Sequence, residues 1–120
     1  MTRPPILVAE DEVMLRVIAV EMLEDAGFQV FEAGDGVEAL ELLKANPQIV
    51  LLVSDIKMPR MDGYALVEQG IALKPDLKVL LMTGYAQEPP PAVLRARKIQ
   101  ILHKPFNLEK LCALAAEMVG

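Results

Sequence analysis

The fold of this chain is decided by one stretch of its sequence, Leu51-Leu-Val-Ser-Asp55-Ile-Lys57-Met-Pro59-Arg-Met-Asp62-Gly63. Its first residues are apolar, which predicts a buried strand, and Asp55 stands where the apolar run ends. Met58-Pro59 and Asp62-Gly63 are typical of turns, because proline presets φ and glycine tolerates positive φ. In open α/β sheets ligands bind beyond the carboxyl ends of the strands, which makes Asp55 a candidate site residue. From this stretch alone, an aspartate that only caps a loop is an equally good interpretation.

Composition and charge narrow the classes of protein to consider. The 120 residues are enough for one domain with one core, which we expect to span 1–120. The net charge of −5 argues against direct binding of nucleic acid. No apolar run approaches the roughly 20 residues of a membrane span, and the first residues lack a signal-peptide pattern. We therefore expect no membrane contact. The single cysteine, Cys112, cannot form an internal disulfide, which suits a reducing compartment, so we expect a cytoplasmic protein.

Apolar strands and helices alternate along the whole chain. The sequence predicts strands at 6–9, 28–33, 51 to Asp55, 78–82 and 99–102. It predicts helices that end at about 25, 45, 73, 97 and 119, the fourth being a short helix at 92–97 after three prolines. Such alternation is typical of an α/β fold with right-handed crossovers. We therefore predict a flavodoxin-like, doubly wound parallel sheet of five strands in the order 2-1-3-4-5, with five helices.

Polar side chains stand at the ends of four of these strands. The first strand ends at Glu10 and Asp11, the third at Asp55, the fourth at Thr83 and the fifth at Lys104. Because parallel strands end at the same edge of a sheet, the fold gathers these groups around one pocket. Three clustered carboxylates repel one another, and Mg²⁺ suits a site with one or two direct carboxylates and several waters. An ionised aspartate between Mg²⁺ and a lysine is a competent nucleophile toward phosphorus.

The whole chain resembles the receiver domain of bacterial two-component response regulators. The resemblance rests on four segments at strand ends: Val8-Ala-Glu10-Asp11, Ser54 to Gly63, Met82-Thr83-Gly84-Tyr85-Ala86 and Lys104-Pro105-Phe106. It implies that Asp55 accepts a phosphoryl group and that Thr83 and Lys104 hold the phosphoryl oxygens. It also implies that Asp11 binds Mg²⁺ directly, that Glu10 acts mainly through water, and that the Lys57 backbone carbonyl is a further ligand. Glu10 replaces the more usual aspartate, and Ile101 stands where many receivers carry an aromatic residue.

The resemblance implies a histidine kinase or a histidine phosphotransfer protein as the phosphodonor, bound through the first helix. That helix carries a predicted core stripe of Leu15, Ile18, Ala19, Met22, Leu23 and Ala26. Val13, Val17 and Val20 form a second apolar stripe roughly opposite, which we interpret as the docking surface. Scattered surface valines with no partner are the alternative interpretation.

Three functions are compatible with these residues. The first is a Mg²⁺-dependent signalling switch that phosphorylates itself on Asp55 and is not an enzyme acting on a separate substrate. The second is a phosphohydrolase, which is disfavoured because Lys57 stands where an acid–base carboxylate would be needed. The third is a phosphorylation-independent interaction module, or a phosphate sink. For the switch, we expect the segment 84–98 to be mobile and to become ordered, through Thr83, on phosphorylation or Mg²⁺ binding. A rigid loop braced by its three prolines is the alternative interpretation.

Overall fold

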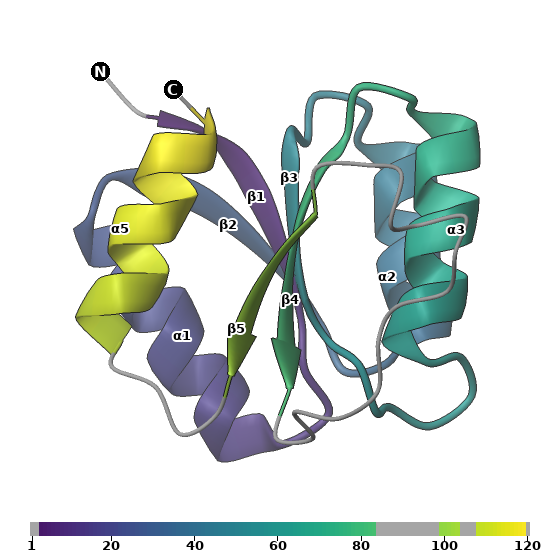
Figure 1. Ribbon diagram of the computed structural model, residues 1–120, viewed down its shortest axis with the longest axis horizontal. Coiled ribbons are helices and arrows are strands. Elements are labelled where there is room, and N and C mark those ends of the chain that lie inside the picture. The colour runs from purple at the N-terminus through teal and green to yellow at the C-terminus, as the bar shows by residue number, and fades with distance from the viewer. Residues whose placement is uncertain (1–2, 84–98, 104–107, 120) are drawn as a thin grey trace.

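Five parallel strands form one sheet in the order β2-β1-β3-β4-β5 (Figure 1). The structure is a computed structural model that describes residues 3–83, 99–103 and 108–119. The strands are β1 (Arg3–Ala9), β2 (Phe28–Ala33), β3 (Leu51–Asp55), β4 (Lys78–Thr83) and β5 (Ile99–His103). Both the parallel pairing and the predicted strand order are confirmed.

The described residues contain four helices, where the sequence predicted five in the whole chain. They are α1 (Val13–Asp25), α2 (Gly36–Ala45), α3 (Gly63–Leu73) and α5 (Leu108–Val119). The short helix predicted at 92–97, and the predicted switch segment 84–98, lie outside the described residues. None of the described helices has the length and apolar character that crossing a bilayer requires.

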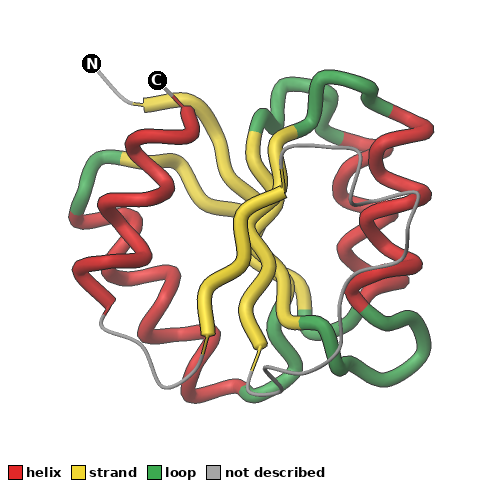
Figure 2. The backbone as a smooth tube through the Cα atoms, in the orientation of Figure 1, coloured by secondary structure: helices red, strands yellow, loops and turns green. Residues whose placement is uncertain are grey.

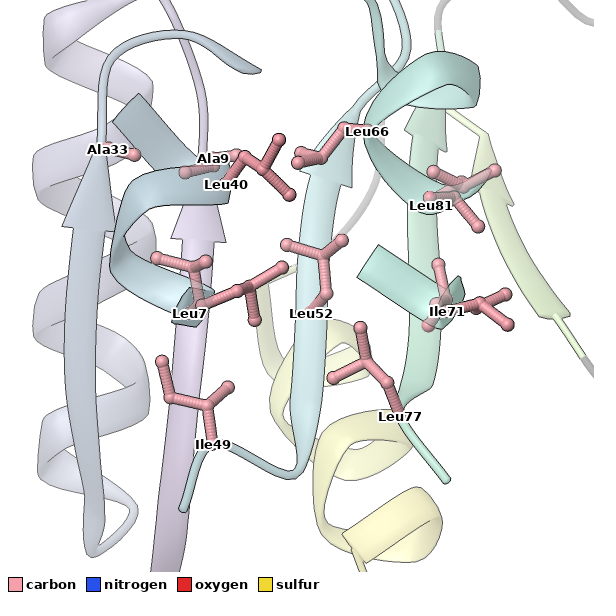
Figure 3. Close-up of a cluster of buried hydrophobic side chains, with 14 of the residues drawn as sticks. Leu7, Ala9, Ala33, Leu40, Ile49, Leu52, Leu66, Ile71, Leu77 and Leu81 are labelled. Atoms are coloured by element: carbon pink, nitrogen blue, oxygen red, sulfur yellow. The ribbon is translucent and has the colours of Figure 1, made fainter. Parts of the chain in front are cut away.

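Two apolar clusters hold the helices against the two faces of the sheet. Figure 1 shows α1 and α5 on one face and α2 and α3 on the other. The cluster under α2 and α3 includes Leu7, Leu52 and Leu81 from three strands, all inaccessible to solvent (Figure 3). The opposite cluster is built on Ile6, Val53 and other strand residues that point the other way. Because successive strand residues face opposite sides, strands covered on both faces must be apolar throughout, as these are.

The first strand begins three residues earlier than the sequence predicted. The apolar run predicted it at 6–9, and the preceding Pro4 and Pro5 lack the N–H groups that a sheet ladder uses. In the structure these prolines contribute through their neighbours and their carbonyl groups instead. The Arg3 N–H donates to the Gly27 carbonyl at 2.9 Å, and the Val50 N–H donates to the Pro5 carbonyl at 3.1 Å. The ladder shifts register between Arg3 and Ile6, which accommodates the two missing donors.

The predicted core stripe of α1 is only partly right. Ala19 and Leu23 are buried as expected, but Leu15 and Ile18 are about 40% exposed. Val20 was assigned to the outer stripe and is instead buried, at 7% exposure. The reason is the rotation of the helix about its axis: the face packed against the sheet is made of Ala19, Val20 and Leu23, and Ile18 lies off that face.

Gly63 allows the loop after β3 to return to the end of that strand. Its N–H donates to the Ile56 carbonyl at 2.7 Å, and Asp62 caps α3 by accepting a hydrogen bond from the Ala65 N–H at 2.9 Å. A Cβ on Gly63 would collide with the Asp55 carbonyl oxygen and lie 2.8 Å from the Ile56 Cα. The close approach therefore requires glycine, and it fixes the backbone immediately after Asp55.

We expect Gly63→Ala to lower the free energy of unfolding by about 3 kcal/mol, since backbone atoms must move to admit the methyl group. Urea unfolding at unchanged m-value measures this difference. Gly70→Ala in α3 is the matched control, because its Cβ would meet only the side-chain ends of Leu43 and Leu77, at 3.2 Å. We expect that control to change stability by no more than about 1 kcal/mol. Equal losses in the two variants would contradict the role assigned to Gly63.

Candidate functional site

Three carboxylates meet at the carboxyl end of the sheet. Glu10 and Asp11 follow β1, and Asp55 ends the neighbouring strand β3. One oxygen from each of the three lies within 4.8 Å of the others. Glu10 is buried, Asp55 is half-buried and Asp11 is exposed. The loops that follow β1 and β3 leave the sheet at the same end, as Figure 2 shows, so the predicted meeting of these three side chains is confirmed.

Glu10 is fixed by hydrogen bonds from three directions. Its N–H donates to the Ala33 carbonyl at the end of β2, at 3.0 Å. Its side-chain Oε2 accepts a hydrogen bond from the Glu12 N–H at 3.3 Å. Its backbone carbonyl accepts a hydrogen bond from Arg16 Nη1 at 2.8 Å. These contacts explain how a carboxylate residue with only 2% exposure is held at the edge of the sheet.

Asp55 stands at the junction between a rigid strand and a constrained loop. It pairs in register with Met82 of β4, and the Ile56 N–H donates to the Met82 carbonyl at 3.3 Å. The Lys57 N–H points to Asp55 Oδ1, at 3.4 Å. Lys57 itself is exposed, and the assignment of its carbonyl as a metal ligand stays a prediction.

The loop after Asp55 is anchored to the start of α2. Arg60 Nε lies 3.6 Å from Asp35 Oδ2, while Oδ1 of the same aspartate accepts the α2 cap hydrogen bond from the Glu38 N–H at 2.8 Å. A Cβ on Gly36 would collide with the Met61 carbonyl oxygen, so glycine permits this contact. Among the described residues Arg60 is the one non-glycine with positive φ, 69°. The loop is thus held in a conformation that few residues adopt freely.

Two predicted site residues fall at the limits of what the structure describes. Thr83 is the last residue of β4, one position beyond the partner of Asp55, so its backbone lies at the same edge of the sheet. Lys104 follows the last residue of β5 directly in the sequence and lies outside the described residues. The roles assigned to the Thr83 hydroxyl and the Lys104 ammonium stay predictions.

The three gathered side chains fit a magnesium ion. They offer only oxygen ligands, and one of them is exposed, so waters can complete the shell that Mg²⁺ usually keeps. A cation would also relieve the repulsion among the carboxylates. Glu10 and Asp11 from the first loop, with Asp55 from the third strand, are the residues that would hold the ion.

Sequence reasoning missed Arg16 and the pair Asp35 and Arg60. Arg16 is the only basic residue within α1, on a helix otherwise rich in apolar side chains, and that isolation is a signal that could have been read. Asp35 was not singled out, although a capping residue followed by Glu38 three positions later is a pattern that the sequence shows. No sequence pattern shows that Arg60 reaches across to Asp35, because the contact joins two separate loops.

Comparison with known proteins gives one family. The family model described as the response regulator receiver domain matches residues 6–116. The receiver protein CpdR of Brucella abortus is 39% identical over 107 residues, which cover 88% of each chain. The sensor kinase CckA of the same organism is 37% identical over 116 residues. That match covers 95% of this chain but only 12% of the kinase.

A solved structure agrees with the sequence comparison. The crystal structure of the receiver domain from the hybrid histidine kinase CckA superposes with a TM-score of 0.83 at 30% identity. The superposition covers 97% of this chain and 99% of that one. The fold therefore agrees with the family of the sequence matches over nearly the whole length.

We expect Asp11→Asn to weaken Mg²⁺ binding at least about tenfold, since loss of even an outer-shell partner typically costs that much. Isothermal titration calorimetry with MgCl₂ measures the dissociation constant. Asp62→Asn is the matched control: it removes the same charge nearby, and asparagine can still accept the cap hydrogen bond from Ala65. If both variants lose affinity equally, general charge rather than ligation explains the binding.

Proposed function

The chain belongs to the response regulator receiver domain family, and we propose that it is a switch phosphorylated on Asp55 in a Mg²⁺-dependent reaction. The observation that carries the proposal is the meeting of Glu10, Asp11 and Asp55 at the ends of β1 and β3, with oxygens within 4.8 Å. A lone aspartate capping a loop would need no such neighbours. The family supports the assignment of Asp55 as the acceptor, because it is the member of the three that ends β3.

In the proposed reaction a carboxylate oxygen of Asp55 attacks the phosphorus of a phosphohistidine. An O–P bond forms, the P–N bond breaks, and its electron pair stays on the imidazole nitrogen, which takes up a proton. The rigid attachment of Asp55 at the end of β3 contributes by positioning, which is most of what phosphoryl transfer requires of a protein. Bound Mg²⁺ would neutralise the developing charge on the phosphoryl oxygens. Glu10, Asp11, Asp55 and the Lys57 carbonyl would hold that ion.

Thr83 and Lys104 have proposed roles on the other side of Asp55. The end of β4 lies next to the end of β3, and β5 lies next to β4. Thr83 ends β4, and Lys104 comes directly after β5 in the sequence. A hydroxyl and an ammonium there would bind the phosphoryl oxygens. The protein then acts on itself rather than on a separate substrate, and phosphorylation is read by a change of its surface.

The proposed phosphodonor is a histidine kinase or a histidine phosphotransfer protein that docks on α1. The relatives include a sensor kinase and a receiver protein, which supports a partner of this kind. The surface proposed for docking is the exposed apolar start of α1, made of Val13, Met14, Leu15, Val17 and Ile18, each at least 38% exposed. These residues lie directly after the acidic pair, so a donor seated there would be close to Asp55. Exposed apolar side chains gathered in this way mark an interaction surface.

Incubation with acetyl phosphate and MgCl₂ should add one phosphoryl group to the protein, and Asp55→Asn should abolish that mass increase. The amide of asparagine is not a nucleophile of this kind, so the effect is on chemistry rather than on folding. Intact-protein mass spectrometry measures the product, and Asp62→Asn, which removes a nearby carboxylate outside the cluster, should still be labelled. Labelling of the Asp55→Asn variant would show that another residue accepts the group.

We expect Val17→Glu to slow transfer from a phosphorylated donor protein by about tenfold, or about 1.4 kcal/mol, because it places a charge in the apolar docking surface. Labelling by acetyl phosphate should stay unchanged, since the small donor needs no docking. Leu73→Glu is the matched control: Leu73 is also exposed, at 50%, but lies at the far end of α3. Equal slowing with both donors would rule out α1 as the docking surface.

A further inference from the structure

We propose that Arg16 is a positioning residue that sets the Mg²⁺ affinity of the site by fixing the peptide group between Glu10 and Asp11. The inference rests on the proposed function, since it concerns the metal site of the phosphorylation reaction. The contacts that the structure gives for Arg16 are with the Glu10 backbone carbonyl and the Glu32 side chain, not with the carboxylates of Glu10, Asp11 or Asp55. Its effect would pass through the backbone of the loop that carries two of them.

The guanidinium group joins the ends of two strands. Arg16 Nη1 donates to the Glu10 carbonyl at 2.8 Å, and Arg16 Nε donates to Glu32 Oε1 at 3.2 Å. Glu32 belongs to β2 and pairs in register with Val8 of β1. The Arg16 side chain is only 19% exposed, so the guanidinium group lies against the protein rather than in solvent. One planar side chain thus binds the loop after β1 and the strand beside it at once.

Space for this contact is provided by Gly34. A Cβ on Gly34 would lie 3.0 Å from Arg16 Nη1, closer than such atoms normally approach. Glycine at the end of β2 therefore lets the guanidinium group pass over the backbone to reach the Glu10 carbonyl. The residues around Arg16 are arranged for this placement, which a solvent-directed arginine would not require.

A hydrogen bond to the Glu10 carbonyl affects the two carboxylates on either side of that peptide group, those of Glu10 and Asp11. A peptide group is planar, so a hydrogen bond to the Glu10 oxygen also fixes the orientation of the Asp11 N–H and Cα. The Glu10 N–H is already bound to Ala33, which leaves the following peptide as the next hinge in the loop. Without Arg16 that peptide could rotate, and the carboxylates of Glu10 and Asp11 would have to be ordered again when the ion binds.

Charge and position predict effects of opposite sign, which makes the proposal testable. Loss of a cation near three carboxylates should strengthen Mg²⁺ binding if Arg16 acts only through its charge. Loss of a positioning contact should weaken it. The double variant Arg16→Met with Glu32→Gln removes one positive and one negative charge, so it leaves the net charge unchanged and isolates position.

The test measures the Mg²⁺ dissociation constant by calorimetry for the wild type, the double variant and Arg16→Lys. We expect binding about tenfold weaker in the double variant, as for loss of other outer-shell partners. Arg16→Lys keeps the charge but has no planar fork to join two acceptors, and we expect it to be weakened as well. Arg3→Met is the control, because Arg3 lies over the Phe28 ring at the opposite end of the same two strands, 4.9 Å from its centroid. It should leave Mg²⁺ affinity unchanged.

Two further readouts separate positioning from a general loss of structure. In Mg²⁺-free protein, ¹⁵N relaxation should show greater motion of the Asp11 and Glu12 amides in the double variant. In acetyl phosphate labelling, the Mg²⁺ concentration for half-maximal rate should rise about tenfold, as the affinity falls, while the rate at saturating Mg²⁺ stays unchanged. Wild-type affinity in the double variant, or an equal loss in Arg3→Met, would overturn the proposal.

The same experiments keep this inference distinct from the proposed function. If the wild type binds Mg²⁺ but Asp55 is not labelled, the proposed function fails while the affinities of the variants still decide the role of Arg16. If the wild type is labelled and the double variant binds Mg²⁺ normally, only the role of Arg16 is overturned. A wild type that does not bind Mg²⁺ would overturn both.

Discussion

All five strands of this sheet run in the same direction, and the rest of the structure depends on that constraint. Parallel pairing places the carboxyl ends of β1 and β3 side by side, so the acids that end these strands must meet. Two unit charges 4 Å apart repel by about 1 kcal/mol in bulk water and about 4 kcal/mol near a protein surface. The folded sheet holds three such groups together, and packing of both its faces outweighs the repulsion.

The loops at this edge keep the carboxylates from moving apart. Glu10 is bound through its N–H, its carbonyl and its side chain, while the loop after Asp55 is held by Gly63 and by Arg60. A carboxylate cluster held in this way is suited to a small divalent cation, whose charge would offset the repulsion among the three side chains. The same rigidity would place Asp55 for attack on phosphorus without further ordering. The contacts that hold the carboxylates together against their repulsion are therefore the same contacts that would position Asp55 for the proposed reaction.

Most of the fold could be predicted because its causes are local or topological. Apolar runs gave the strands, their alternation with helices gave the parallel sheet, and the residues at the strand ends gave the carboxylate cluster. The burial of α1 was partly mispredicted, since this helix has apolar residues on more than one face and periodicity does not show which face meets the sheet. Val20 and Ile18 exchanged places for that reason. Arg16 and Arg60 were missed because their partners, Glu32 and Asp35, are distant in sequence and no pattern joins them.

The central claim is that Asp55 is the group that receives the phosphoryl unit, with Glu10 and Asp11 holding Mg²⁺ beside it. A crystal structure of the protein with Mg²⁺ and beryllofluoride, a stable mimic of the phosphoryl group, tests this most directly. We expect beryllium bonded to a side-chain oxygen of Asp55, and Mg²⁺ bound by Asp55, by Asp11 and by the Lys57 carbonyl, with Glu10 reached through water. Beryllofluoride on Asp11 or Glu10, or a magnesium ion bound away from these three carboxylates, would contradict it.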